Sequence, residues 1–479
     1  MKRRTFINNS FWITTGLVTS CNKTIPEKKN QARVISGKVK SGDKGLANVV
    51  ISDGFSVVKT SSDGRYEIKL ASESKHIFVS LPSGYEFPHE NNLAKHYNFA
   101  KEAPFLSLID SISEVNINFH LTPLKVNDRK HSFIIWADPQ IANESDVVKL
   151  ATSVADVQSY VQSLPANTLI HGITVGDLVS DNLPLFKNYN DAIAQCGMPF
   201  FQVLGNHDID YDNGLGENAR ISFKKNYGPT YYSFNRGNVH YVVLDNILYS
   251  GSGFKYKGSI PQEQLEWLKK DLSFVSPDKL IILCAHIPLA GVDNREELYN
   301  ILRPYNVHVM SGHKHYNQNI IKDHVFEHVH SAVCGAWWTG DVAIDGTPLG
   351  YAVYEVDNTN IKWHFKSVGF DKSYQLRTAV SLKAGKKYVQ ANVWNWDPNW
   401  KVQWSANGVN KGTLGKVSEF DVKTTALYKG PDLPEGELKW IEPVQTEHLF
   451  SAPIPAGTTQ IKVIATDRFE NIYESILDV

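Results

Sequence analysis

The sequence predicts an α/β protein in which a central α/β region is flanked by two small β-sandwich-like domains. In residues 131–368, continuous apolar runs alternate with helical segments at the spacing of βαβ units. Residues 33–122 and 372–479 instead show short alternating runs broken by turns, which is typical of small antiparallel β domains. With 479 residues, 42% hydrophobic and 21% charged, the chain has the composition of a folded protein of several domains.

Charge and cysteine content exclude several classes of function. Lys and Arg total 49 and Asp and Glu total 50, so the net charge is −1 and no basic field is available for a nucleic-acid polymer. The four cysteines, Cys21, Cys196, Cys284 and Cys334, are too few and too scattered for a disulfide framework or a Cys-rich zinc site. A metal site in this chain must therefore use His, carboxylate and amide ligands.

The N-terminus has the pattern of an export signal. Three basic residues at positions 2–4 precede a modest apolar stretch that ends in small residues, and this stretch is too short to span a bilayer. Residues 3–7 resemble a twin-arginine signal and residues 18–21 resemble a bacterial lipobox, which implies lipidation of Cys21. We expect a signal peptide over 1–21. The alternative is a frayed cytosolic N-terminus with chance basic residues.

The predicted signal peptide places the mature protein in the bacterial cell envelope, facing the periplasm or the cell surface. Its only membrane contact would be the lipid anchor, and the polar residues 22–32 would serve as a flexible linker. The first β domain, 33–122, carries an Asp63-Gly64 turn followed by alternating Tyr66 and Ile68, which suits a hairpin. Because no cluster of titratable residues accompanies it, we expect a spacer or binding module.

The central region contains both amphipathic helices and buried strands. Residues 145–164 and 261–272 place apolar side chains on one helical face, as covering helices do. Continuous apolar runs predict strands that are buried on both faces, at 133–137, 172–175, 199–204, 240–245, 280–285 and 307–310. In the last β domain the clearest alternating runs are 379–396 and 460–469.

Five of the central strands end in polar clusters. In chain order these are Asp138-Pro139-Gln140, Gly176-Asp177, Gly205-Asn206-His207-Asp208, His286 and Gly312-His313-Lys314-His315. Ligands of open α/β sheets bind beyond the carboxyl ends of the strands, so these clusters should converge. Taken singly, an Asp-Pro turn or a histidine after a strand is more often structural. Together and in this order, carboxylates, an amide and imidazoles indicate a two-metal site.

The ordered set resembles the calcineurin-like metallophosphoesterase family, whose motifs read D-x-H, G-D, G-N-H, H and G-H-x-H. Four of the five match, over residues 131–368. Segments 334–341, 394–400 and 465–471 resemble bacterial three-part members of that family, with an N-terminal and a C-terminal β domain. The resemblance implies a four-layer α/β sandwich and hydrolysis of a phosphomonoester or phosphodiester by a hydroxide that bridges two divalent metal ions.

The resemblance also implies a role for each polar residue. One metal would be held by Asp138, Asp177 and His315, with Gln140 where a histidine usually stands. The other would be held by Asp177, Asn206, His286 and His313. His207 would protonate the leaving group as general acid, with Asp208 orienting its imidazole.

Metal and substrate follow from the same residues. Among Mn, Fe, Zn and Mg, the oxygen donor of Gln140 favours Mn. A dinuclear centre with two carboxylates and a hydroxide keeps about one positive charge, which suits a small phosphate ester or a glycan-linked phosphate. Residues 176–182 lack the arginine of protein Ser/Thr phosphatases, which argues against a protein substrate. Trp337 and Trp338 either stack on substrate or pack the joint to the last domain, and the sequence favours neither.

Two alternatives stay open at the level of the sequence. The chain could be an inactive envelope-binding lipoprotein whose phosphoesterase scaffold was degraded by the Gln140 change, or a metallohydrolase that acts on other esters. Residues with chemical groups outside the motifs are expected to be structural. These are His171, His240, Cys284 and the cluster Trp394, Trp396 and Trp400.

Overall fold

The computed structural model describes residues 34–99, 114–251, 253, 255–433 and 438–479. Residues Arg33–Val479 form one compact unit. The predicted signal peptide 1–21, with Cys21, and the predicted linker 22–32 lie outside the described residues. Within the described part of the chain, every helix is too short or too polar to cross a bilayer.

Two mixed sheets form the central region. The first has seven strands in the order β24-β23-β12-β13-β14-β8-β7 and the second has six in the order β15-β16-β19-β20-β22-β21. The first contains β7 (His89–Glu90), β8 (Leu93–Ala94), β12 (Lys130–Trp136), β13 (Ile170–Thr174), β14 (Phe200–Gln202), β23 (Gly350–Asp357) and β24 (Asn360–Ser367). The second contains β15 (Tyr232–Arg236), β16 (Val239–Val243), β19 (Leu280–Cys284), β20 (Asn306–Ser311), β21 (Gln318–Lys322) and β22 (Val325–Val329). All six predicted central strands are confirmed.

The two sheets pack face to face through aromatic side chains. Phe201 of the first sheet stacks on Phe234 of the second at 3.9 Å between ring centroids. Phe133 meets Tyr241 edge-on, and the Tyr241 hydroxyl lies 2.7 Å from His131 Nε2. Strands β12, β13 and β14 are parallel, as are β16, β19, β20 and β22, so each sheet collects the carboxyl ends of its inner strands at one edge.

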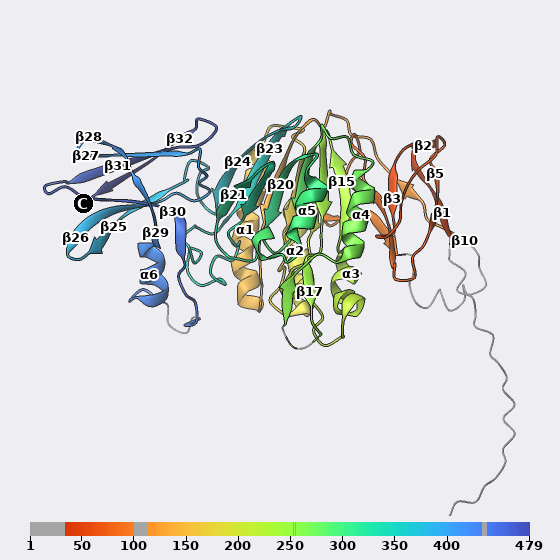
Figure 1. The fold of residues 1–479 in the computed structure, drawn as a ribbon, viewed down its shortest axis with the longest axis horizontal. Helices are drawn as coiled ribbons and strands as arrows, with labels where there is room; N and C mark the ends of the chain where they lie inside the picture. The colour runs from red at the N-terminus through yellow and green to blue at the C-terminus, as the bar shows by residue number, and fades with distance from the viewer. Residues whose placement is uncertain (1–33, 100–113, 252, 254, 434–437) are drawn as a thin grey trace, which may run out of the picture. The chain divides into compact units, whose positions relative to one another are not determined.

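Helices cover the outer faces of both sheets. They are α1 (Glu144–Ser163), α2 (Phe186–Ile193), α3 (Ile221–Tyr227), α4 (Gln262–Leu272) and α5 (Arg295–Leu302). A further helix, α6 (Val422–Lys429), lies in the C-terminal region. The Asn143 side chain caps α1 by accepting the Asp146 N–H, and the helix buries Leu150, Val154 and Val157. Helices α1 and α2 contact each other, as do α4 and α5 (Figure 1). Both predicted helices are confirmed within one residue at each end.

Two small sheets precede the central region. One contains β1 (Val34–Ser41), β2 (Lys44–Gly45), β5 (Arg65–Lys69), β10 (Glu114–Asn116) and β11 (Phe119–His120). The other contains β3 (Val50–Ser52), β4 (Val57–Lys59), β6 (His76–Ser80) and β9 (Tyr97–Phe99). The hairpin predicted at Asp63-Gly64 is wrong. The turn does form, with the Gly64 N–H donating to the Ser61 carbonyl, but it links strands of different sheets because β5 pairs with β1.

Part of the region predicted as the first β domain extends the central sheet. Strand β8 pairs in parallel with β14, with Leu93 opposite Phe200, and β7 pairs with β8. Side chains also cross from this region, because the Tyr231 hydroxyl donates to the Gly54 carbonyl and the Trp267 indole to Ser52 Oγ. The boundary near residue 122 therefore divides the sequence pattern but does not separate two independent cores.

Two further sheets follow the central region. One contains β25 (Arg377–Lys383), β26 (Lys386–Asn392), β29 (Gly415–Phe420) and β30 (Gln445–Pro453), and the other contains β27 (Lys401–Ala406), β28 (Val409–Thr413), β31 (Gln460–Thr466) and β32 (Ile472–Asp478). Their inner faces share a core that includes Val389, Val402 and Ile461. A short two-stranded sheet, β17 (Ile247–Tyr249) with β18 (Tyr256–Gly258), lies in the central region.

Candidate metal centre

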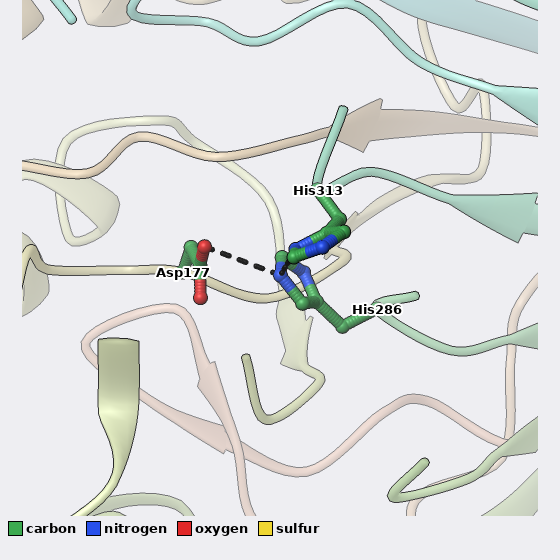
Figure 2. Close-up of side chains that lie close together, drawn as sticks. All are labelled: Asp177, His286 and His313. Carbon is green, nitrogen blue, oxygen red and sulfur yellow. Dashed lines mark hydrogen bonds and ion pairs between the residues drawn. The ribbon is translucent and has the colours of Figure 1, made fainter. Parts of the chain in front are cut away.

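Three side chains from different strand ends meet at the carboxyl edge of the central sheets. Asp177 follows β13, His286 follows β19 and His313 follows β20, and one ligand atom from each lies within 4.8 Å of the others. Asp177 Oδ2 is 3.2 Å from His286 Nε2, and His286 Nε2 is 3.2 Å from His313 Nδ1. Figure 2 shows the three side chains pointing toward one another. Asn206 joins them, since its Oδ1 lies 3.1 Å from His286 Nε2.

A second group of polar side chains adjoins the first through Asp177. Gln140 Nε2 donates to Asp177 Oδ2 at 3.1 Å. His315 Nε2 lies 3.6 Å from Asp138 Oδ1, and the His313 backbone N–H donates to the Asp138 carboxylate at 2.9 Å. Each of the seven side chains that the sequence suggested as metal ligands therefore contacts another of the seven, and Gln140 links the second group to Asp177.

Backbone carbonyls orient two of the imidazoles. His286 Nδ1 lies 2.8 Å from the Val175 carbonyl, and His315 Nδ1 lies 2.9 Å from the Gly335 carbonyl. A carbonyl can only accept, so each Nδ1 carries a proton and each Nε2 faces the carboxylates. This arrangement is the usual support for metal-binding histidines.

The loops that carry these side chains adopt unusual backbone conformations. Positive φ values occur at five of the seven residues, namely Asp138 (49°), Gln140 (41°), Asp177 (53°), His313 (69°) and His315 (54°). Non-glycine residues in this region are strained, and such strain concentrates at functional sites. Glycines permit the close approach, because a Cβ on Gly205 would lie 2.1 Å from Asp177 Oδ1 and one on Gly176 would lie 2.4 Å from His286 Nδ1.

The protonation equilibria reflect buried carboxylates that lie beside imidazoles. Burial, reinforced by repulsion from Asp177, raises the pKa of Asp138 to about 8. Burial lowers the pKa of His286, but its ion pair with Asp177 outweighs burial and raises that pKa to about 9. Burial lowers the pKa of His313 to about 3 and that of His315 to about 4, so both imidazoles are neutral at pH 7.

These residues fit divalent metal ions. Two buried carboxylates and three imidazoles form a donor set in which a cation would supply the positive charge that a proton on His286 supplies without it. The buried Gln140 Oε1 has no hydrogen-bond partner among the described residues, and a carbonyl oxygen in this position is a suitable ligand for a hard cation. The group with Asp177, His286 and His313 and the group with Asp138, Gln140 and His315 could each hold one ion.

His207 lies beside the centre with a carboxylate partner that differs from the expected one. Its Nδ1 is 2.9 Å from Asp181 Oδ2, and both side chains are about one-third exposed, at 30% and 33%. Asp208, which was expected to orient His207, is buried and accepts backbone N–H groups of Gly205, Leu178 and Val179 at 2.9, 2.9 and 3.2 Å. Asp208 therefore ties the loop after Asp177 to the turn at Gly205. Its carboxylate is occupied by three backbone amides and does not orient the His207 imidazole.

The electrostatic surroundings keep His207 protonated. Burial lowers the pKa of His207, but Asp177 and Asp181 outweigh burial and raise it to about 9. Burial, with repulsion from Asp177, raises the pKa of Asp208 to about 7. A protonated imidazole with a carboxylate behind it is the arrangement of a general acid.

The two tryptophans suggested as substrate contacts have different environments. Trp338 is buried and its indole N–H donates to the Pro139 carbonyl at 3.0 Å, so it supports the loop of Asp138 and does not face a substrate. Trp337 stacks on the His315 imidazole at 4.3 Å and meets Trp440 edge-on at 4.6 Å. Trp440 is 57% exposed. Trp337 therefore packs against the last domain, which was the second possibility considered for this pair.

Three residues near the site carried no sequence motif. Asp181 follows Asp177 by four positions in the same loop, and this spacing was the one available signal. The Tyr211 hydroxyl donates to the Asn206 carbonyl at 2.6 Å, and Tyr256 meets the His313 ring edge-on at 6.0 Å. His171, His240 and Cys284 are buried in the sheets.

Comparison with known proteins gives three consecutive family matches. A model of calcineurin-like phosphoesterase matches residues 108–317, a model of the N terminal of calcineurin-like phosphoesterase matches 33–107, and a model of its C terminal matches 327–473. No curated protein matches the chain.

Several solved structures share parts of the fold at low identity. A purple acid phosphatase from yellow lupin (Lupinus luteus) seeds is 14% identical over 67% of this chain and 67% of that chain, with a TM-score of 0.39. GAP50, the anchor in the inner membrane complex of Plasmodium, is 16% identical over 50% of this chain and 85% of that chain, with a TM-score of 0.36. A 5'-nucleotidase from Candida albicans is 13% identical over 52% and 53% of the two chains, with a TM-score of 0.33.

Proposed function

The chain belongs to the calcineurin-like phosphoesterase family, and we propose that it hydrolyses a small phosphate ester with the help of two divalent cations. Family membership makes it a metal-dependent phosphoric ester hydrolase. The observation that supports a dinuclear site is the position of Asp177, whose Oδ2 lies 3.2 Å from His286 Nε2 and 3.1 Å from Gln140 Nε2. One carboxylate thus contacts both groups of candidate ligands.

Each part of the chain has a defined task in this proposal. Asp138, Gln140, Asp177 and His315 would hold one ion, and Asp177, Asn206, His286 and His313 the other. Bound divalent ions supply the positive charge that activates a water nucleophile and neutralises the phosphoryl group. His207 Nε2 donates a proton to the leaving oxygen, and Asp181 holds the imidazole at Nδ1 in the orientation that this transfer requires.

The substrate class follows from charge and from the residues around His207. A site with a net positive charge favours an anionic phosphate over a neutral carboxylic ester. Residues 176–182 contain no arginine that could clamp a phosphate in two-point fashion. We therefore propose a small phosphomonoester or phosphodiester, including a glycan-linked phosphate, with Mn as the preferred ion.

Metal content and turnover of one variant test this proposal. The protein loaded with Mn should hydrolyse an aryl phosphomonoester or a bis-aryl phosphodiester. Asp177→Asn should lose about 100-fold or more in kcat/KM and lower the bound metal, measured by elemental analysis, toward zero or one ion per chain. A matched control is Asp397→Asn, a buried aspartate in the loop between β26 and β27, which should keep metal and turnover.

Three results would each contradict part or all of the proposal. If the Mn-loaded protein turned over neither ester, the chain would be an envelope-binding protein with an inactive scaffold. If it hydrolysed carboxylic esters and not phosphate esters, the substrate class would be wrong. Two bound ions in the wild type and unaltered metal content in Asp177→Asn would reject the shared carboxylate.

We also propose that the protein is an exported lipoprotein anchored through Cys21. The support is the sequence pattern of residues 1–21, with its basic residues, apolar stretch and lipobox-like end. Cells that express the full chain should incorporate labelled palmitate into the protein, and Cys21→Ser should abolish the label. Equal labelling of both forms would contradict the anchor.

A further inference from the structure

Strand β19 ends two residues before the candidate ligand His286, so the backbone that follows the strand needs another support. Strands β16 and β19 pair in parallel as far as Val243 opposite Cys284, and the Leu244 N–H still donates to the Cys284 carbonyl at 2.9 Å. Ile287, the residue after His286, is buried beyond the end of this ladder. Its peptide groups must find other partners, because buried unpaired N–H and C=O groups are costly.

The Asn246 side chain takes the place of a neighbouring strand. Its Oδ1 accepts the Ile287 N–H at 3.1 Å, and its Nδ2 donates to the Ile287 carbonyl at 2.7 Å. Because the backbone N–H can only donate, the orientation of the amide is determined. Asn246 is 0% exposed. One buried amide thus holds both peptide groups of Ile287, and two bonds in this geometry fix the direction of the main chain as it leaves His286.

Asn246 is itself held by a buried network that reaches helix α4. Gln264 grips the backbone of Asp245 in the same two-point way, since its Oε1 accepts the Asp245 N–H at 3.1 Å and its Nε2 donates to the Asp245 carbonyl at 3.0 Å. The Asp245 carboxylate accepts from Arg220 Nη2 at 3.2 Å. All three residues are buried. A buried polar network with its members paired in this way is rigid, so Asn246 has a fixed position from which to act.

The other contacts of His286 fix different parts of the same residue. The Val175 carbonyl accepts from Nδ1 of the ring at 2.8 Å, and the Gly312 N–H donates to the His286 carbonyl at 3.0 Å. Asn246 completes this set by holding the next peptide, that of Ile287. Partners of this kind around a metal-binding histidine determine its orientation, and their loss typically lowers metal affinity about 10- to 100-fold.

We propose that Asn246 is a positioning residue that acts through Ile287 on His286 and thereby sets the affinity for one of the two ions. His286 belongs to the group of candidate ligands with His313, and not to the group with His315. Loss of the Asn246 amide should therefore weaken the ion of the first group and spare the ion of the second. The inference rests on the proposed two-ion centre.

Titration of the metal-free protein with Mn tests the inference without any measurement of turnover. Asn246→Ala should weaken one of the two ions about 10- to 100-fold and leave the other within about twofold of the wild type, as measured by calorimetry. Electron paramagnetic resonance gives a second readout. The wild type should show the coupled spectrum of two neighbouring Mn ions, and the variant, at a Mn concentration between its two dissociation constants, the spectrum of an isolated ion.

Asn294 provides a matched control, because its side chain makes the same pair of hydrogen bonds with another isoleucine. Its Oδ1 accepts the Ile260 N–H at 3.0 Å, and its Nδ2 donates to the Ile260 carbonyl at 2.8 Å. Neither Asn294 nor Ile260 adjoins a candidate ligand in the chain. Asn294→Ala removes as many hydrogen bonds as Asn246→Ala and should also lower the urea midpoint of unfolding, but it should keep both ions at wild-type affinity.

A second variant keeps the test decisive if Asn246→Ala does not fold. Gln264→Ala removes the two hydrogen bonds that hold Asp245 and leaves the Asn246 amide in place. It should weaken the same ion by a smaller factor, about two- to tenfold.

The outcomes separate this inference from the two-ion centre on which it rests. Two ions in the wild type and unchanged affinities in Asn246→Ala, or in Gln264→Ala where it is used instead, would overturn the role of Asn246 and leave the two-ion centre intact. Equal weakening of both ions, or the same selective loss in Asn294→Ala, would also overturn that role. A wild type that binds fewer than two ions would reject the two-ion centre, and the inference with it.

Discussion

At the scale of single residues, the site divides into side chains that carry a motif and side chains that act on them. The seven candidate ligands belong to short patterns that follow apolar strands, and these patterns are readable in the sequence. Asp181 and Asp208 are both aspartates next to such patterns, and only coordinates distinguish their tasks. Asp181 pairs with His207, whereas Asp208 accepts three backbone amides.

The proton-donor role of His207 leads to a prediction about leaving groups. His207→Ala should lower kcat about 100-fold or more for an alkyl phosphate, whose leaving oxygen needs a proton. For a p-nitrophenyl ester the loss should be much smaller, since that leaving group departs as an anion. Steady-state kinetics on the two substrates measure the difference. Equal losses on both would mean that His207 only positions the neighbouring ligand Asn206.

A companion prediction concerns its partner Asp181. Asp181→Asn should reproduce the leaving-group dependence of His207→Ala with a smaller loss, about tenfold, because the imidazole stays in place but is less well oriented. Metal content should be unchanged in the same sample. Asp191→Asn, an exposed aspartate on α2, is the control and should retain full activity. A loss of bound metal in Asp181→Asn would contradict a role through His207.

At the scale of secondary-structure elements, the turns after the strands determine whether the ligands meet. Gly205 ends the segment after β14, and the space that a Cβ would need is occupied by the backbone nitrogen and Oδ1 of Asp177, both 2.1 Å away. Alternating and continuous apolar runs are sufficient to predict the strands themselves. The pairing of β5 with β1, in a different sheet from β4, was not predictable, because a turn signal does not state which sheet each flanking strand joins.

The close approach of Gly205 to Asp177 predicts that adding a methyl group at Gly205 weakens metal binding. Gly205→Ala should displace Asp177 and lower the affinity for Mn about 10- to 100-fold, and it should also reduce the free energy of unfolding by about 1 to 3 kcal/mol. Gly415→Ala on β29 is the control, since its Cβ would meet only the Ser451 carbonyl oxygen at 3.4 Å. Metal titration and urea unfolding measure both effects. Equal behaviour of the two variants would show that the Gly205 turn can relax.

At the scale of the whole molecule, the fold buries an unusual number of histidines outside the metal centre. Burial lowers the pKa of these side chains to about 3 or 4, and they are His76, His96, His131, His308, His330 and His364. Each is neutral in the folded state at pH 5, where the unfolded chain would hold a proton at an ordinary pKa of about 6.5.

The sign of this linkage predicts acid sensitivity. Well above pH 6.5 both states are neutral at these six positions, so these histidines do not alter the free energy of unfolding there. As pH falls from about 6.5 toward 4, the unfolded state takes up protons that the folded state excludes, so stability decreases progressively. Urea midpoints measured at pH 8, 7, 6 and 5 should therefore fall steeply below pH 6.5. A midpoint that rises between pH 7 and 5 would contradict this account.

The cost of burying a histidine without hydrogen bonds can be tested directly at His96. His96 has neither ring nitrogen hydrogen-bonded among the described residues and is surrounded by Phe78, Tyr97, Phe201 and Tyr232. His96→Phe should raise the free energy of unfolding by about 1 kcal/mol at pH 8, because it removes unpaired polar atoms, and by more at pH 5.

The control for this substitution is a histidine with both nitrogens bonded. His240 lies 2.8 Å from Asp271 and 3.0 Å from Asn235, so His240→Phe should destabilise by about 3 kcal/mol, because the buried Asp271 carboxylate loses its imidazole partner and keeps only the Ser233 hydroxyl. Denaturant unfolding of both variants gives the comparison. Destabilisation of similar size in both would mean that ring packing, and not hydrogen bonding, determines the cost.

The sequence by itself determined the central strands, the two covering helices and the seven candidate ligands. Each of these depends on residue type and spacing within a short segment, and such a pattern can be read without knowing which distant segments it contacts. The tertiary structure alone decided that Asp181 and not Asp208 faces His207, that Trp338 lies under a loop, and that β7 and β8 extend the central sheet. These outcomes depend on which distant segments become neighbours, and that contact exists only after the sheets have packed.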